Sequence, residues 1–92
     1  MKVSRQVDVS AVDRVVREVF AGILQIDPAS LEDGTHLVND LAVDSLDALE
    51  LALKIQERFG IQLDEEEFAR FTTYGEVVAC ARDNVAPASV KP

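Results

Sequence analysis

The stretch DSLDALELALKIQERFG, residues 44 to 60, narrows the possible folds of this 92-residue chain more than any other. Asp44 and Asp47 have the spacing of a capping box and Gly60 is typical of a helix end, so we predict a helix from Ser45 to Phe59. Two neighbouring apolar rows run along it at helical spacing. The first row comprises Ala48, Leu51, Ala52, Ile55 and Phe59, and the second comprises Leu46, Leu49 and Leu53. A small core needs only one such row.

Three further helices are predicted, and no strands. The first runs from Ser10, its expected N-cap, to Leu24, with valines at 3.6-residue spacing. A short third helix follows Asp64 as N-cap, with Glu67 completing a capping box. The last begins at Thr73, which pairs with Glu76 in another capping box, and ends near residue 85.

The connection between the first two helices, residues 25 to 43, is long for a compact domain. Pro28 could open a single helical turn within it, and Leu31, Leu37 and Leu41 are expected to pack against the core. The prediction is therefore an all-α domain, a small four-helix bundle with a long loop between helices 1 and 2 and a short third helix. We assign residues 10–86 to this domain, and residues 1–9 and 87–92 to a flexible N-terminal extension and a flexible C-terminal tail.

Acidic residues gather in the middle of the chain, whose formal net charge is −8. Residues 27 to 67 hold twelve of the seventeen acids and only two bases, Lys54 and Arg58. Such a surface repels nucleic acid and anionic lipid and attracts basic protein patches. No apolar run could span a bilayer, and the N-terminus lacks the apolar segment of a signal peptide. We expect no nucleic-acid partner, no stable membrane insertion and a cytoplasmic location.

Catalytic and metal-binding patterns are missing. The single histidine, His36, rules out a two-histidine metal motif. The single cysteine, Cys80, rules out an internal disulfide and is expected in the core. Ser45 lacks the glycines of a GxSxG elbow, and no phosphate-binding glycine loop or calcium loop occurs. We predict that the chain is not an enzyme and holds no metal.

Ser45 and the second leucine row remain to be explained. A phosphate ester on Ser45 would meet the free N–H groups at a helix start, although serine and aspartate are also common there for capping alone. The leucine row, with Asp47, Glu50 and Glu57 beside it, is typical of a partner-binding face. The alternative is a helix that its neighbours bury on two sides.

The segment DLAVDSLDALEL resembles the phosphopantetheine attachment site of acyl carrier proteins, in which an Asp-Ser-Leu triplet opens the second helix. The resemblance extends in register from about Val12 to Val78 and includes ALELALKIQERFGIQL and FTTYGEVV. It implies a four-helix bundle of acyl-carrier type in which the second helix is the recognition helix.

The resemblance implies that Ser45, which Asp44 and Leu46 flank, carries a covalent 4′-phosphopantetheine arm that comes from coenzyme A. It also implies that acyl groups are bound to the thiol of this arm as thioesters. The implied partners are a phosphopantetheinyl transferase and the acyl-transfer and synthase enzymes of fatty-acid, lipid or polyketide-type synthesis, which meet a monomeric carrier through basic docking patches. The expected partner-binding residues are Asp44, Leu46, Asp47, Leu49, Glu50, Leu53, Glu57, Glu65 and Glu66.

The bundle could also shelter the acyl chain in a cavity between its helices. The side chains expected to line this cavity are those of Leu51, Phe59, Val77 and Cys80. The bulky residues that could limit the length of the acyl chain or close the cavity are Phe68, Phe71 and Tyr74.

Departures from the family pattern favour a specialised carrier over a housekeeping one. Ala42 stands where the family usually has glycine, Gln56 and Arg58 stand where acids are frequent, and Lys54 adds a base. Two alternatives stay open: an unmodified carrier-like bundle that serves as a protein-interaction module, and an aminoacyl or peptidyl carrier.

Overall fold

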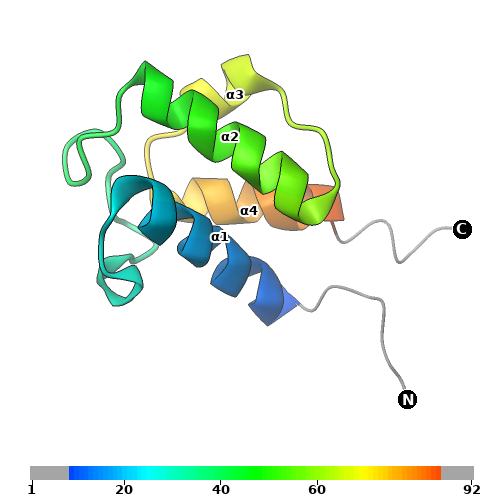
Figure 1. Ribbon diagram of the computed structural model, residues 1–92, viewed down its shortest axis with the longest axis horizontal. Coiled ribbons are helices and arrows are strands. Elements are labelled where there is room, and N and C mark those ends of the chain that lie inside the picture. The colour runs from blue at the N-terminus through cyan, green and yellow to red at the C-terminus, as the bar shows by residue number, and fades with distance from the viewer. Residues whose placement is uncertain (1–8, 86–92) are drawn as a thin grey trace, which may run out of the picture.

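The computed structural model describes residues 9–85, which form four α-helices and one short 3₁₀ turn. In chain order these are α1 (Val9–Leu24), η1 (Pro28–Ser30), α2 (Ser45–Phe59), α3 (Glu65–Ala69) and α4 (Tyr74–Val85). In Figure 1, α2 lies across the bundle above α1 and α4, and the short α3 lies beside α2. Between residues 9 and 85 the only β-type pairing is an isolated bridge from His36 to Thr73. The predicted all-α bundle is confirmed.

Local hydrogen bonds hold both predicted ends of α2 and the start of α4. The Asp44 carboxylate accepts from the Asp47 N–H at 2.8 Å, and the Asp47 carboxylate accepts from the Asp44 N–H at 3.3 Å. Gly60 ends the helix at a φ of +68°, in the left-handed region that glycine adopts without strain. At α4, Glu76 accepts from the Thr73 N–H at 3.2 Å and donates its own N–H to the Thr73 hydroxyl at 3.3 Å. These predictions are confirmed.

Two other cap predictions need correction. Ser10 is not the N-cap of α1, because the backbone is already helical at Val9. Asp64 does cap α3, by accepting from the N–H groups of Glu66 and Glu67 at 2.9 and 3.4 Å. The reciprocal bond from the Glu67 side chain is not formed among the described residues, so Asp64 is a simple cap and not half of a capping box. The predictions for residues 1–8 and 86–92 lie outside the described part of the chain.

The first apolar row of α2 faces the core. Leu51, Ala52 and Ile55 are buried in the core, where α2 packs mainly against α1 and α3, and Ala48 and Phe59 are half-buried at the edges of the row. The long loop is held to the same core as predicted: Leu31 and Leu37 are buried, and Leu41 is partly buried against the core.

A polar network that sequence reasoning missed joins α1, the long loop and α4. The Tyr74 hydroxyl donates to the Asp13 carboxylate at 2.9 Å, and burial together with this hydrogen bond raises the pKa of Tyr74 above its ordinary value. Arg17 donates to the carbonyl oxygens of Pro28 and Leu31, both at 2.8 Å, and its guanidinium lies 5.3 Å from the centre of the Tyr74 ring. The network therefore holds in place the loop that leads to α2.

Candidate functional site

Ser45 is the first residue of α2, and its side chain is exposed. Its hydroxyl makes no hydrogen bond within residues 9–85. The Asp44 carboxylate satisfies the Asp47 N–H, whereas the N–H groups of Ser45 and Leu46 have no partner in that part of the chain. Free N–H groups at a helix start carry partial positive charge and favour an anion. The site therefore offers an accessible hydroxyl beside two donors suited to a phosphate ester.

The two aspartates that flank Ser45 have a structural role of their own. Asp44 and Asp47 cap α2 by accepting from each other's backbone N–H groups; Asp44 is exposed and Asp47 is half-buried. Capping accounts for the acids on either side of the serine but leaves the serine hydroxyl free. Ser45 is thus not explained by capping.

The loop that leads to Ser45 contains a residue in a strained conformation. Ala42 has a φ of +58°, in the left-handed region that alanine disfavours. Its N–H donates to the Val38 carbonyl at 3.0 Å, and the next N–H, from the buried Val43, donates to the Leu37 carbonyl at 3.0 Å. The tight turn requires this conformation, which explains why glycine suits the position where Ala42 stands.

A partly open apolar pocket of about 190 Å³ adjoins Ser45. The loop, the first turn of α2 and the end of α3 meet around it. Its lining residues are Leu37, Val38, Val43, Asp44, Ser45, Ala48, Phe68, Ala69 and Phe71. Leu37, Val43 and Phe68 are buried, whereas Val38 and Ala69 are exposed at the mouth. An apolar group tethered to Ser45 would find an apolar surface beside its attachment point.

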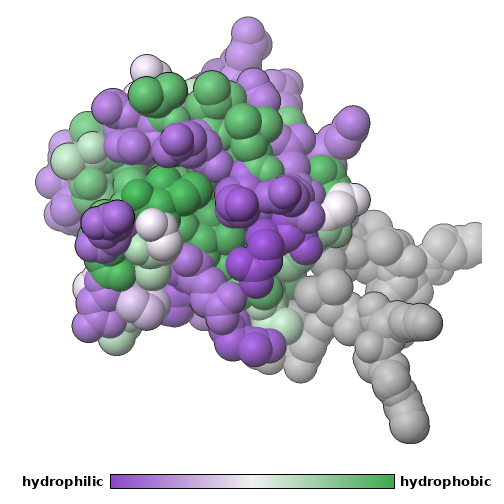
Figure 2. Space-filling view, in the orientation of Figure 1, coloured by the Kyte–Doolittle hydropathy of each residue, from purple (hydrophilic) through white to green (hydrophobic). Residues whose placement is uncertain are grey.

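The second leucine row of α2 is open to solvent. Leu46, Leu49 and Leu53 are 65%, 38% and 49% exposed, which excludes the alternative of a helix buried on two sides. Figure 2 shows apolar residues interspersed with hydrophilic ones on the face that carries α2. Exposed leucines rimmed by charge are typical of an interaction surface.

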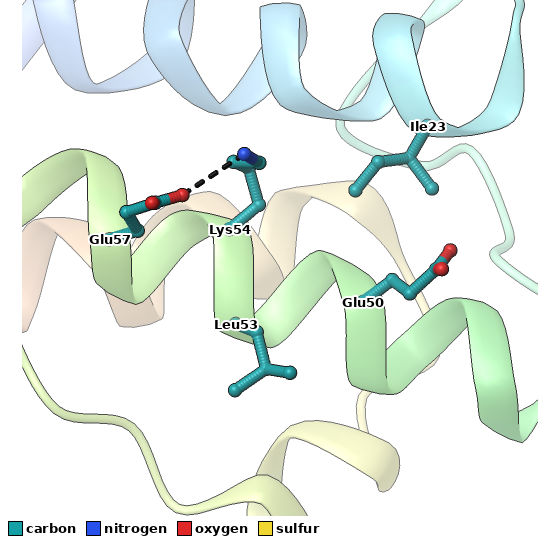
Figure 3. Close-up of a pocket in the computed structure, with 5 residues that line it drawn as sticks. All are labelled: Ile23, Glu50, Leu53, Lys54 and Glu57. Carbon is teal, nitrogen blue, oxygen red and sulfur yellow. Dashed lines mark hydrogen bonds and ion pairs between the residues drawn. The ribbon is translucent and has the colours of Figure 1, made fainter.

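Charge is distributed unevenly along this face. An open groove of about 530 Å³ is lined by Ile23 of α1 and by Glu50, Leu53, Lys54 and Glu57 of α2 (Figure 3). Lys54 pairs with Glu57 at 3.0 Å, so the far half of the helix partly neutralises its own acid.

A second ion pair in the same half of α2 joins the Arg58 guanidinium to the Glu18 carboxylate of α1 at 3.2 Å. Asp44, Asp47 and Glu50 form no ion pair within residues 9–85. Negative charge that is free to attract a partner is therefore concentrated at the Ser45 end of α2.

The remaining predicted contact residues, Glu65 and Glu66, are exposed in the first turn of α3. Their helix contributes Phe68 to the pocket beside Ser45, so α3 borders the site. The structure thus brings the predicted site and contact residues onto α2 and its neighbour α3, and it adds the pocket that sequence reasoning did not foresee.

The residues proposed to line a cargo sheath do not form one cavity. Leu51 and Val77 are fully buried in a closed core. Cys80 is half-buried beside α3, and burial raises the pKa of its thiol. His36 is a loop residue whose Nδ1 accepts from the Asn39 N–H at 3.0 Å, a local bond of the kind expected.

Two absences complete the description of residues 9–85. No group of three or more His, Cys, Asp or Glu side chains could hold a metal ion. No helix in this part of the chain combines the length and apolar character needed to cross a membrane.

Comparison with known proteins agrees with this geometry. Residues 14–81 match the family model described as "Phosphopantetheine attachment site", a span that includes Ser45 and the whole of α2 and α3. One similar protein is "Acyl carrier protein 2" of Ralstonia nicotianae (strain ATCC BAA-1114 / GMI1000). It is 37% identical over 71 residues, which cover 77% of this chain and 88% of the relative.

Proposed function

The chain belongs to the acyl carrier proteins, and we propose that Ser45 is the residue that carries its 4′-phosphopantetheine arm. Proteins of this family are carriers on which enzymes act, and are not themselves catalysts. The observation that carries the proposal is the exposed Ser45 hydroxyl, which makes no hydrogen bond within residues 9–85 and lies at the start of α2 beside an apolar pocket.

The modification forms a bond from the Ser45 hydroxyl oxygen to the phosphorus of coenzyme A that bears pantetheine. The pyrophosphate bond breaks, and 3′,5′-adenosine bisphosphate leaves. The serine proton must pass to a base of the transferase, because no side chain of residues 9–85 accepts a hydrogen bond from Ser45. When bound, the arm supplies a thiol that holds acyl groups as thioesters.

The residues around Ser45 suit this arm in two ways. The N–H groups of Ser45 and Leu46 point out of the helix start and can donate to the phosphodiester. The pocket lined by Val43 and Phe68 offers apolar surface to whatever apolar group the arm carries. Asp44 caps the first turn of the helix, at whose start Ser45 is exposed.

Partner enzymes, the transferase included, meet what we call the docking face. It comprises Asp44, Leu46, Asp47, Leu49, Glu50, Leu53, Glu57, Glu65 and Glu66. The exposed leucines supply contact area, and the acids steer basic patches toward Ser45. Because Glu57 is paired with Lys54, the steering charge lies at the Ser45 end, where cargo must be delivered.

The same charge distribution supports a specialised pathway over general fatty-acid synthesis. The Lys54–Glu57 and Arg58–Glu18 pairs leave the far half of α2 close to neutral. A partner with a uniformly basic surface would gain little there. We therefore propose a dedicated carrier for a polyketide, a modified lipid or a similar acyl product, working as a monomer in the cytoplasm.

The test is the intact mass of the protein after incubation with coenzyme A and a broad-specificity phosphopantetheinyl transferase. The wild type should gain one 4′-phosphopantetheine, and Ser45→Ala should gain none. Ser30→Ala removes another exposed serine hydroxyl and should be modified like the wild type. No gain on the folded wild type, or a gain that persists in Ser45→Ala, would refute the proposal and leave the docking face as a plain interaction surface.

A further inference from the structure

We propose that His36 is a pH-operated cap, which holds the turn before α2 when its imidazole is neutral and releases that turn when the imidazole is protonated. His36 is the single histidine of the chain, and the proposed function assigns it no role. The inference is therefore independent of the modification of Ser45. It concerns a regulatory property, the response of the loop before α2 to mild acid.

Residues 37–41 form a single turn in the loop that leads to α2. At its start the Asp40 N–H donates to the His36 carbonyl at 2.9 Å, the spacing of an α-helical bond. At its end the Val43 N–H donates to the Leu37 carbonyl at 3.0 Å. Because Val43 comes just before the N-cap of α2, this turn fixes the path by which the chain enters the helix.

His36 occupies the N-cap position of this turn. Its Nδ1 accepts from the Asn39 N–H at 3.0 Å, and its own N–H donates to the Asp40 carboxylate at 2.8 Å. These two bonds resemble a capping box, in which two side chains satisfy the free N–H groups at a helix start. The usual caps are serine, threonine, aspartate and asparagine, whose oxygens accept throughout the neutral range. An imidazole accepts only through an unprotonated nitrogen.

Protonation of the imidazole removes the acceptor of this cap. Both nitrogens of an imidazolium carry a proton, so Nδ1 would present a second donor to the Asn39 N–H. Imidazole in model peptides gains its proton at about pH 6.5, so mild acid is sufficient. Asn39 is exposed, and its N–H can turn to water once the bond is lost. Acid therefore removes a bond that holds the start of the turn.

The carboxylates near His36 favour the same release. Asp40 lies on the loop, and Glu76 lies on α4, where it accepts from the N–H of Thr73, the residue that His36 faces in the isolated bridge. Hydrogen bonds from the N–H groups of Thr72 and Thr73 are the largest causes that lower the pKa of Glu76. The charge of His36 lowers this pKa further, so the two side chains interact. An imidazolium that turns toward Glu76 leaves the cap position.

The experiment follows the backbone amides of isotope-labelled protein by NMR between about pH 5 and pH 8, the range in which histidine changes its charge. The exchange rate of the Asn39 N–H with water, divided by that of an unstructured peptide at the same pH, measures its protection. The matched amide is that of Asp47, whose N–H donates to the Asp44 carboxylate at 2.8 Å in a cap of the same kind. Carboxylates in model peptides keep their charge over most of this range.

In the wild type, the protection of Asn39 should fall about five- to ten-fold toward the acidic end, the loss expected for one hydrogen bond, while that of Asp47 holds. His36→Asn should keep the protection at every pH, because the side-chain oxygen of asparagine can replace Nδ1 as acceptor and does not titrate. His36→Ala should lack it at every pH. In Glu76→Gln the release should move to lower pH by roughly 0.2–0.7 pH unit, because the imidazolium loses a counter-charge.

Three results would overturn the inference. The first is a wild-type Asn39 amide whose protection does not change with pH, or changes only together with that of Asp47. The second is a His36→Asn variant that loses this protection in acid as the wild type does, since acid would then act through another group. The third is a folded His36→Ala variant with wild-type protection. If a variant does not fold, the wild-type profile with its Asp47 control still decides the question.

Discussion

Replacing Ala42 by glycine should stabilise this protein, although the reverse is usual for this substitution. Ala42 has a φ of +58°, and its side chain is exposed, so its removal costs little buried apolar surface. A left-handed conformation costs an L-residue roughly 1–2 kcal/mol, and glycine adopts it freely. Glycine also gives the unfolded chain more freedom, which offsets about 0.4–1 kcal/mol. For values near the middle of these two ranges, the net gain in the free energy of unfolding is about 0.5–1 kcal/mol.

This gain is measurable by urea and thermal unfolding followed by far-ultraviolet circular dichroism. For a domain of this size it corresponds to a midpoint about 2–8 °C higher. Ala79→Gly is the matched control, because Ala79 is exposed within α4 and glycine in a helix interior destabilises by about 1 kcal/mol. The two substitutions should therefore have opposite signs. If Ala42→Gly destabilises as much as Ala79→Gly, the strain argument for the loop before Ser45 is wrong.

Three further predictions follow from the same contacts. Tyr74→Phe should lower the free energy of unfolding by about 1–2 kcal/mol, because it removes the hydroxyl bond to Asp13. Since the folded-state pKa of Tyr74 is raised by burial and by Asp13, wild-type stability should hold below about pH 10 and fall above it. The phenylalanine variant should lack this fall, and an identical alkaline profile would contradict the assignment. Leu51→Ala should lower the free energy of unfolding by about 2–5 kcal/mol and Leu53→Ala by less than about 0.5 kcal/mol, because only Leu51 is buried. Equal decreases in denaturant titrations would count against the orientation of α2. The transferase should modify wild-type Ser45 more slowly as the salt concentration rises. The Glu50→Lys variant should be modified more slowly than the wild type, and its rate should depend less on salt. A modification rate that changes neither with salt nor with this substitution would rule out steering by the acidic residues.

Helix α2 could be predicted residue by residue because its ends depend on local contacts. The Asp44–Asp47 bonds and the Gly60 cap join groups within a few positions, so the pattern of residue types suffices. The start of α1 was placed one residue late, since a serine near a helix start can lie inside it as well as before it.

Which leucine row of α2 would be covered could not be settled from its own pattern. Both rows have helical spacing, and burial depends on where α1, α3 and α4 lie around the helix. Burial of Leu51 in the core that α2 shares mainly with α1 and α3 leaves Leu46 and Leu53 exposed. The proposed docking face depends on this orientation.

The sequence by itself determined the helical class, the place of Ser45 at the start of α2 and the resemblance to acyl carrier proteins, because each rests on residues that are close together in the chain. Only the tertiary structure decided the bond from Tyr74 to Asp13, 61 residues away, and the pocket beside Ser45, where the long loop, the start of α2 and the end of α3 come together. It also showed the left-handed turn at Ala42. Contacts between distant segments depend on how whole helices pack, since a side chain's neighbours are chosen by the fold and not by its position in the chain.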